Sequence, residues 1–335
     1  MRVGIVGAGL IGKKRGVAAL ADGDSVIEVI ADVDLEKAKT LASELGAKDV
    51  TVDWETLTKH PNIDAVIITT PNHLHAPIAI NALKNNKHVL CEKPLATLVN
   101  DAETMVKLAE SNKLIIKTGF NHRHFSHIWK AKELCDAGVI GDLMYIRGHY
   151  GHGGRAGYDK EWRGNVKLSG GGELMDQGVH MVDLCRWFLG DFSEAYGFTR
   201  NYNWGTDTIE DNAFFTLSTA GQRIAHIHVS WTEWKNDFSF EIFGKKGYLK
   251  LKGLTGYYGI PKLILGVKAD KSVVPEESYF EFPNEDISFC DEWREFKSAI
   301  LEQRRVLADG VDGLKALKCI NAVYESNKTG KRVYI

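Results

Sequence analysis

Residues 2–12 read RVGIVGAGLIG, a short apolar run that leads directly into a glycine-rich turn. The run is rich in Val and Ile, as β-strands are, and Gly7, Gly9 and Gly12 follow in the GxGxxG pattern of dinucleotide-binding folds. Such glycines allow a tight bend, a close approach of the backbone to a pyrophosphate and close packing of the next helix. Asp32 ends the next apolar run, where a carboxylate accepts the ribose hydroxyls of NAD. The pattern therefore predicts an NAD site.

The alternation of elements predicts the fold class. Strand-like runs lie at residues 26–33, 64–71, 88–94 and 114–120, with helical segments such as 35–45 and 101–111 between them. This order is typical of a parallel sheet covered by helices. After residue 140, strand-like runs follow one another without helices, at 143–151, 212–218, 222–231, 238–244 and 247–253. An antiparallel sheet is expected there, and residues 287–303 and 310–330 return to helix, the second ending at Gly330.

Two domains follow from this reading. We expect an α/β Rossmann domain with a doubly wound parallel sheet over residues 1–120. Residues 121–335 are expected to form an α+β domain for substrate binding and oligomerisation, with an open, mostly antiparallel sheet. The late helices at 286–328 are candidates to pack back on the Rossmann domain.

Composition excludes several classes of protein. The 335 residues carry a formal net charge of -2, so no basic surplus points to nucleic acid or to an anionic membrane. No apolar run approaches the roughly 18 residues of a membrane span, and the first strand starts too early for a signal peptide. The five cysteines are scattered, which is typical of reduced thiols. We expect a cytoplasmic protein that binds a small molecule and forms a homo-dimer or homo-tetramer through the C-terminal sheet.

Polar motifs follow the next strands of the predicted parallel sheet. TTPNHLH at 69–75 and CEKP at 91–94 both end apolar runs, at the edge where open α/β sheets bind ligands. Pro94 holds Lys93 in extended backbone and is a candidate for a cis peptide bond. The residues expected to contact the cofactor are Gly7, Gly9, Leu10, Ile11, Gly12, Asp32, Thr70, Pro71, Asn72, His75, Glu92, Lys93 and Asn121. Asp34, Lys37 and Lys39 leave some use of NADP open beside NAD.

A buried-looking helix at 171–189, GGELMDQGVHMVDLCRWFL, contains Asp176 and His180 four positions apart. On a continuous α-helix these two residues and Asp183 share a polar stripe roughly 60° wide. Such a stripe needs polar partners or a cavity, so a satisfied core histidine competes with a catalytic one. If Gly178 delays the helix start, Asp176 becomes an N-cap residue instead. Asp183 is interpreted as structural.

Taken together, these motifs resemble the glucose-fructose oxidoreductase, inositol dehydrogenase and rhizopine catabolism (Gfo/Idh/MocA) family over nearly the whole chain. The resemblance rests on AGLIG with Asp32, TPNHLHAP, CEKPLA, GFNHRH and GGGELMDQGVH. It implies a Rossmann domain followed by a C-terminal domain with an open, mostly antiparallel sheet. It also implies that Lys93, Asp176 and His180 line the nicotinamide and the substrate carbon.

The implied reaction is hydride transfer from a secondary alcohol carbon of a sugar, nucleotide sugar or cyclic polyol to nicotinamide. A histidine ordinarily has a pKa of about 6.5, whereas a lysine would need its pKa lowered from about 10.4, at a cost of about 4 kcal/mol. We therefore expect His180 to act as general base, Asp176 to stabilise its imidazolium and Lys93 to bind the alcohol oxygen. The reverse assignment, with Lys93 as base, stays open.

The glycine-rich loop before this helix supplies further candidates. Tyr158, Trp162 and Arg163, together with Arg123 after the strand-like run at 114–120, are expected to contact the substrate, because guanidinium groups pair with oxyanions and aromatic faces cover ring carbons. For each of these four residues, a role in ordering the loop or in an oligomer contact is nearly as good an interpretation. Three HxH pairs invite a metal site, but no cysteine or carboxylate completes a zinc spacing, so none is expected.

Two further classes of function compete with a dehydrogenase. The resemblance implies that an NAD-dependent glycosidase, which oxidises the ring transiently, and a non-catalytic NAD-binding regulator also occur among such proteins. The presence of Lys93, Asp176 and His180 argues against the regulator, because a sensor needs the pocket but not the base.

Overall fold

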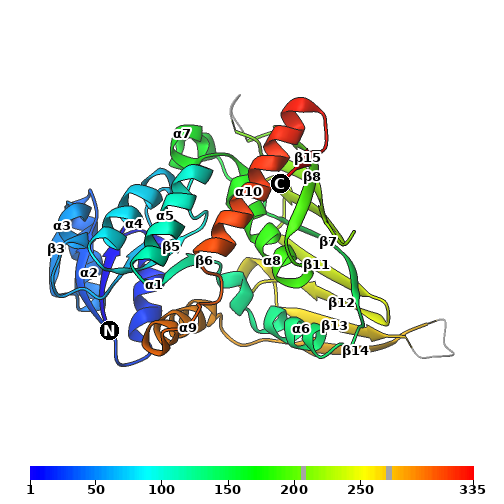
Figure 1. Cartoon of the computed structure of the whole chain (residues 1–335), viewed down its shortest axis with the longest axis horizontal. Helices are drawn as coiled ribbons and strands as arrows, with labels where there is room; N and C mark the ends of the chain where they lie inside the picture. Colours follow the sequence, from blue (N-terminus) through cyan, green and yellow to red (C-terminus); the bar gives the residue numbers. More distant parts are fainter. Residues whose placement is uncertain (205–208, 269–273) are drawn as a thin grey trace. The chain divides into compact units, whose positions relative to one another are not determined.

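The chain divides into two units, of which the first is discontinuous in sequence. The computed structural model describes residues 1–204, 209–268 and 274–335. The first unit holds Met1–Asn121 and Ile287–Leu317, and the second holds His122–Asp286 and Lys318–Ile335 (Figure 1).

A six-stranded sheet in which every strand pair is parallel forms the centre of the first unit. Its strands are β1 (Arg2–Val6), β2 (Val26–Ala31), β3 (Asp49–Thr51), β4 (Ala65–Ile68), β5 (His88–Glu92) and β6 (Ile116–Gly119). The order β3-β2-β1-β4-β5-β6 reverses between β1 and β4, and doubly wound sheets bind their ligands at the carboxyl ends of strands at such a reversal. The sheet confirms the predicted Rossmann fold. The short strand β3 was not predicted.

Helices from both ends of the chain complete this unit. They are α1 (Leu10–Leu20), α2 (Leu35–Leu45), α3 (Trp54–Thr58), α4 (His75–Lys84), α5 (Val99–Ser111) and α9 (Ser288–Glu302). Trp293 and Phe296 of α9 share one buried apolar cluster with Ile5, Ile30 and Ile67 of the sheet. The core of the Rossmann unit therefore includes side chains of α9, which lies far from the six strands of this sheet in sequence.

The second unit contains a nine-stranded sheet, which confirms the predicted open and mostly antiparallel fold. Its strands are β7 (Leu143–Gly151), β8 (Phe192–Arg200), β9 (Asn212–Thr219), β10 (Ile224–Ser230), β11 (Asp237–Gly244), β12 (Gly247–Lys252), β13 (Lys262–Val267), β14 (Glu276–Glu281) and β15 (Val333–Tyr334). The order is β14-β13-β12-β11-β7-β10-β9-β8-β15, and only the β7–β10 pair is parallel among the described pairs. Strands β8, β13, β14 and β15 were not predicted.

Period-two burial along β10 explains why one face of this sheet packs on the core. Ala225, Ile227 and Val229 are fully buried, whereas Ile224 and His226, which alternate with them, are exposed. Helices of this unit include α6 (Ser126–Asp136) and α8 (Val179–Leu189). Helix α10 (Gly310–Thr329) begins in the first unit and ends in the second, before Gly330 at a φ of +65°. Oligomerisation through this sheet stays a prediction.

Over the described ranges 1–204, 209–268 and 274–335, no helix combines the length and the apolar character that a membrane span requires.

Candidate active site

The turn after β1 has the shape that a pyrophosphate-binding loop needs. Gly7 has a φ of +107°, which side chains rarely adopt, and a Cβ on Gly12 would lie 2.0 Å from the carbonyl oxygen of Gly7. A Cβ on Gly9 would meet nothing within 4 Å, so this side of the turn is open. Helix α1 begins at Leu10 without an acidic residue in its first turn, which leaves its positive end available for an anion. These residues fit the diphosphate of NAD.

Asp32 is fixed directly beside this turn. Its Oδ2 accepts the backbone N–H of Ala8 at 2.7 Å, and its Oδ1 accepts the backbone N–H of Asp34 at 2.9 Å. The two bonds hold the carboxylate at the carboxyl end of β2, next to the glycine-rich turn. A carboxylate in this position accepts ribose hydroxyls and repels a 2′-phosphate, which favours NAD over NADP.

Two glycine variants test the proposed cofactor cradle, which we define as Gly7–Gly12 and Asp32. One variant tests cofactor binding and the other tests the stability of the turn. Gly9→Ala is expected to weaken NADH binding about 10-fold or more, because the methyl group points into the open side of the turn, while stability changes by less than about 0.5 kcal/mol. Gly12→Ala is expected to lower the free energy of unfolding by about 1–3 kcal/mol, because its Cβ meets backbone. NADH fluorescence titration and urea unfolding measure the two effects. Undiminished NADH binding by Gly9→Ala would contradict the assignment of the cradle.

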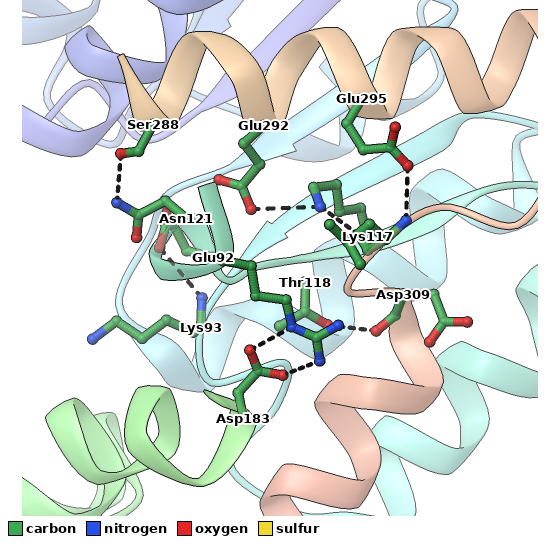
Figure 2. Close-up of polar contacts among 12 residues, drawn as sticks. Glu92, Lys93, Lys117, Thr118, Asn121, Asp183, Ser288, Glu292, Glu295 and Asp309 are labelled. Carbon is green, nitrogen blue, oxygen red and sulfur yellow. Dashed lines mark hydrogen bonds and ion pairs between the residues drawn. The ribbon is translucent and has the colours of Figure 1, made fainter. Parts of the chain in front are cut away.

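The residues predicted to contact the cofactor all lie in the first unit, at the carboxyl ends of its parallel strands. Residues 7–12 follow β1, Asp32 follows β2 and residues 70–75 follow β4. Glu92 ends β5, and Lys93 follows it directly. Asn121 follows β6, and its amide donates to the Ser288 hydroxyl of α9 at 3.0 Å (Figure 2). The Lys93–Pro94 peptide bond is cis, as predicted.

His75 differs from the other predicted cofactor residues, because its ring is fully buried. Nδ1 lies 2.7 Å from the carbonyl oxygen of Pro94, and Nε2 lies 3.0 Å from the carbonyl oxygen of Thr70. Both ring nitrogens therefore face backbone oxygens of the protein. A direct hydrogen bond from this ring to the cofactor stays a prediction.

A buried ionic network holds Glu92, one of the residues predicted to contact the cofactor. Arg15 of α1 donates from Nε to Glu92 Oε1 at 2.8 Å and also pairs with Glu292 of α9. Lys117 of β6 lies 3.7 Å from Glu292 and donates to the carbonyl oxygen of Leu307 (Figure 2). Burial lowers the pKa of Arg15, but Glu292 and Glu92 outweigh it and raise this pKa above the usual range.

Sequence reasoning did not identify Arg15, Lys117 or Glu292, and no local pattern marks them. Arg15 and Glu292 are 277 positions apart, so only folding brings them together. Glu92 Oε2 in turn accepts the backbone N–H of Lys93 at 3.3 Å. Glu92 thus links the buried ionic network to the backbone of Lys93, the predicted catalytic lysine.

Asp176 and His180 lie in the second unit, on a helix that differs from the predicted one. Residues Leu174–Gly178 form a π-helical turn, η5, which continues without a break into α8. The predicted polar stripe assumed a continuous α-helix, and the wider π turn changes the angular spacing of its residues. Asp176 is consequently neither an N-cap residue nor part of a regular α-helical stripe. Such π turns are frequent at functional sites.

The side chain of Asp176 has a charged partner in the preceding loop. Arg163 donates from Nε to Asp176 Oδ2 at 3.2 Å, and its guanidinium lies 4.5 Å from the centre of the Trp162 ring. Burial lowers the pKa of Arg163, but the charge and hydrogen bond of Asp176, together with Tyr158 and Glu161, outweigh burial and raise this pKa above the ordinary value. Arg163, predicted to contact the substrate, therefore has a carboxylate partner in this unit.

His180 is 5% exposed, and its ring stacks on that of His122, with 3.8 Å between the ring centres and an interplanar angle of 26°. In the sequence, His122 is one member of an HxH pair with His124. Tyr150 and Phe125 also contact the His122 ring, each with centres 5.4 Å apart. Aromatic rings therefore lie beside the proposed base. The position of His122 shortly after β6 was the one sequence signal that could have placed it in the site.

Tyr158 and Arg123, two further residues predicted to contact the substrate, differ in the groups that surround them. Tyr158 is 5% exposed and packs edge-on against Trp231 with centres 4.5 Å apart, and burial raises the pKa of its hydroxyl. The guanidinium of Arg123 is nearly fully buried and forms two hydrogen bonds with Asp183, at 2.8 Å and 2.5 Å (Figure 2). This pairing agrees with the structural interpretation of Asp183, and a substrate contact of Arg123 stays a prediction.

The predicted catalytic residues are shared between the units, with Lys93 in the first and Asp176 and His180 in the second. In the part of the chain that the structure describes, no group of three or more His, Cys, Asp or Glu side chains is arranged to hold a metal ion.

Comparison with known proteins identifies the family. Residues 1–120 match the model of the GFO_IDH_MocA oxidoreductase family with an NAD-binding Rossmann fold, and residues 128–250 match the GFO/IDH/MocA C-terminal domain. Levoglucosan dehydrogenase of Pseudarthrobacter phenanthrenivorans is 33% identical over 58% of this chain, and the match spans about half (52%) of that relative. Glucose-6-phosphate 3-dehydrogenase of Bacillus subtilis is 28% identical over 88% of this chain and 85% of its own.

Solved structures show the same fold. A levoglucosan dehydrogenase in complex with NADH superposes with a TM-score of 0.91 at 24% identity, covering 100% of this chain and 99% of its own. Both domain models belong to one family, and their order along the chain is that of the two sheets. The chain therefore belongs to the GFO/IDH/MocA family of NAD-dependent oxidoreductases.

Proposed function

We propose that this protein oxidises a secondary ring hydroxyl of a sugar, nucleotide sugar or cyclic polyol to a ketone. The observation that carries the proposal is that one chain combines the cradle at Gly7–Gly12 and Asp32 with Lys93, Asp176 and His180. The names of several relatives agree with it, since levoglucosan, glucose 6-phosphate and myo-inositol are all ring compounds with secondary hydroxyls.

The proposed chemistry assigns one role to each side chain. NAD, when bound, supplies the acceptor for the hydride that leaves the alcohol carbon. His180 removes the proton of the hydroxyl group, and the negative charge of Asp176 stabilises the resulting imidazolium. Lys93 donates a hydrogen bond to the oxygen as it gains negative charge. Arg163 holds the Asp176 carboxylate in place.

The test is a substrate panel with NAD, followed at the NADH absorbance band. Levoglucosan, glucose, glucose 6-phosphate, a nucleotide sugar and myo-inositol cover the proposed class, and steady NADH formation with at least one of them is expected. Cleavage of a chromogenic glycoside without net NADH formation would replace the dehydrogenase by a glycosidase. NADH binding with neither activity would indicate a regulator.

Two arginines of one loop test the role of Asp176. Arg163→Gln is expected to lower kcat/KM about 10- to 100-fold, the equivalent of one hydrogen bond to a charged group. Arg155→Gln is the matched control, because Arg155 pairs with Glu161 at a more exposed position and should change kcat/KM less than about 3-fold. Equal effects of the two substitutions in steady-state kinetics would contradict the assigned role of Arg163.

A further inference from the structure

The ring of His75 joins two backbone segments that follow neighbouring strands. His75 opens α4 and is fully buried. Its Nδ1 lies 2.7 Å from the carbonyl oxygen of Pro94, after β5, and its Nε2 lies 3.0 Å from the carbonyl oxygen of Thr70, after β4. A single side chain thus spans the carboxyl ends of two strands of the parallel sheet.

The chemistry of these contacts limits what the ring can do. A backbone carbonyl oxygen only accepts hydrogen bonds, so each contact needs an N–H from the imidazole. The neutral ring carries one N–H and the protonated ring carries two. In both states the ring nitrogens are directed at the backbone, and the ring acts on the site through the segments that it joins.

Those segments carry residues of the proposed site. Pro94 directly follows Lys93, and Lys93 is held on its other side by the backbone bond from its own N–H to Glu92 Oε2 at 3.3 Å. Thr70 precedes Asn72, which is 6% exposed and begins the short helix that leads into His75. A shift of the Pro94 carbonyl therefore moves the backbone of the proposed catalytic lysine.

We propose that His75 is a positioning residue, which fixes the backbone of Lys93 by tying the Pro94 carbonyl to the segment around Thr70. The kinetic consequence rests on the proposed function, whereas the structural consequence does not. Misplacing a catalytic group by about 1 Å costs up to roughly 10²-fold in rate. Loss of the tie therefore lowers kcat much more than it lowers the affinity for NADH, which the glycine-rich turn and Asp32 provide.

Two substitutions remove the tie in steps. His75→Phe keeps a planar ring but no N–H, and it is expected to lower kcat about 10²-fold while the Kd for NADH rises by a clearly smaller factor, because the glycine-rich turn and Asp32 are unchanged. His75→Gln keeps one donor nitrogen and is expected to lose about 10-fold in kcat. Amide hydrogen exchange, measured by mass spectrometry, is expected to rise in peptides covering residues 69–72 and 91–95 of both variants.

His88→Phe is the matched control. Its Nδ1 accepts the backbone N–H of Ile115 at 2.9 Å, at the amino end of β5, so this variant also loses one backbone tie of the same sheet. We expect a comparable loss of stability on urea unfolding but a kcat within about 3-fold of the wild type. This comparison separates positioning from a merely structural effect.

The proposal is overturned if His75→Phe and His88→Phe lower kcat equally, or if exchange at 91–95 is unchanged in both His75 variants. Should His75→Phe fail to fold, His75→Gln gives the same comparison. If the wild-type protein forms no NADH from any compound of the panel, the proposed function fails, and the exchange measurement still decides on the tie.

Discussion

Replacing His180 by alanine is expected to lower kcat by about 10²- to 10⁴-fold, the contribution of a general base. The affinity for NADH should stay within about 3-fold of the wild type, because the glycine-rich turn and Asp32 belong to the first unit, whereas His180 belongs to the second. Steady-state kinetics at the NADH absorbance band give kcat, and fluorescence titration gives the Kd.

A second histidine provides the control for this experiment. His226 lies on the exposed face of β10 and contacts Thr216, so His226→Ala should leave kcat within about 2-fold. Unchanged turnover in His180→Ala would refute His180 as the base. If Lys93→Met then abolished turnover, the base would be Lys93, the reverse assignment that the sequence left open.

Replacing Glu292 by glutamine is expected to lower the free energy of unfolding by about 3–5 kcal/mol, the cost of breaking a buried ion pair. Glu292 is fully buried between two cations, pairing with Arg15 and lying 3.7 Å from Lys117. The neutral amide keeps the shape of the side chain but leaves these two buried charges with less compensation. Urea unfolding followed by tryptophan fluorescence measures the loss.

An exposed pair of the same unit is the control. Arg2 and Asp64 are 2.8 Å apart, but their side chains are 46% and 38% exposed, so Asp64→Asn should cost at most about 1 kcal/mol. A similar small cost for Glu292→Gln would contradict the view that the network stabilises the first unit. A rise in the Kd for NADH is also expected in Glu292→Gln, because Arg15 positions Glu92 next to Lys93.

The elements that the sequence predicted have strong local signals. Runs rich in Val and Ile marked β1, β2 and β4, and alternating apolar residues marked β10. One of the missed strands, β14, lacks such a signal. Strand β14, with the sequence EESYFE, lies at the edge of its sheet and is mostly exposed, so its pattern has no buried face to display.

The helix around Asp176 also has a feature that no local sequence signal predicted. Its apolar composition predicted a buried helix correctly, but the π turn at Leu174–Gly178 was not predicted. A π turn bonds residues i and i+5 where an α turn bonds i and i+4, which widens the turn. The relation between Asp176 and His180 could therefore not be derived from residue spacing alone.

The sequence by itself determined the cofactor cradle and the two sheet types, because turns, strand periodicity and helix starts depend on residues close together in the chain. Only the tertiary structure decided which charges are paired: Arg15 with Glu92 and Glu292, Arg123 with Asp183, and Arg163 with Asp176. The first and second of these pairings join residues up to 277 and 60 positions apart. A side chain finds such a partner only after the elements that carry both have packed, so no local pattern encodes it.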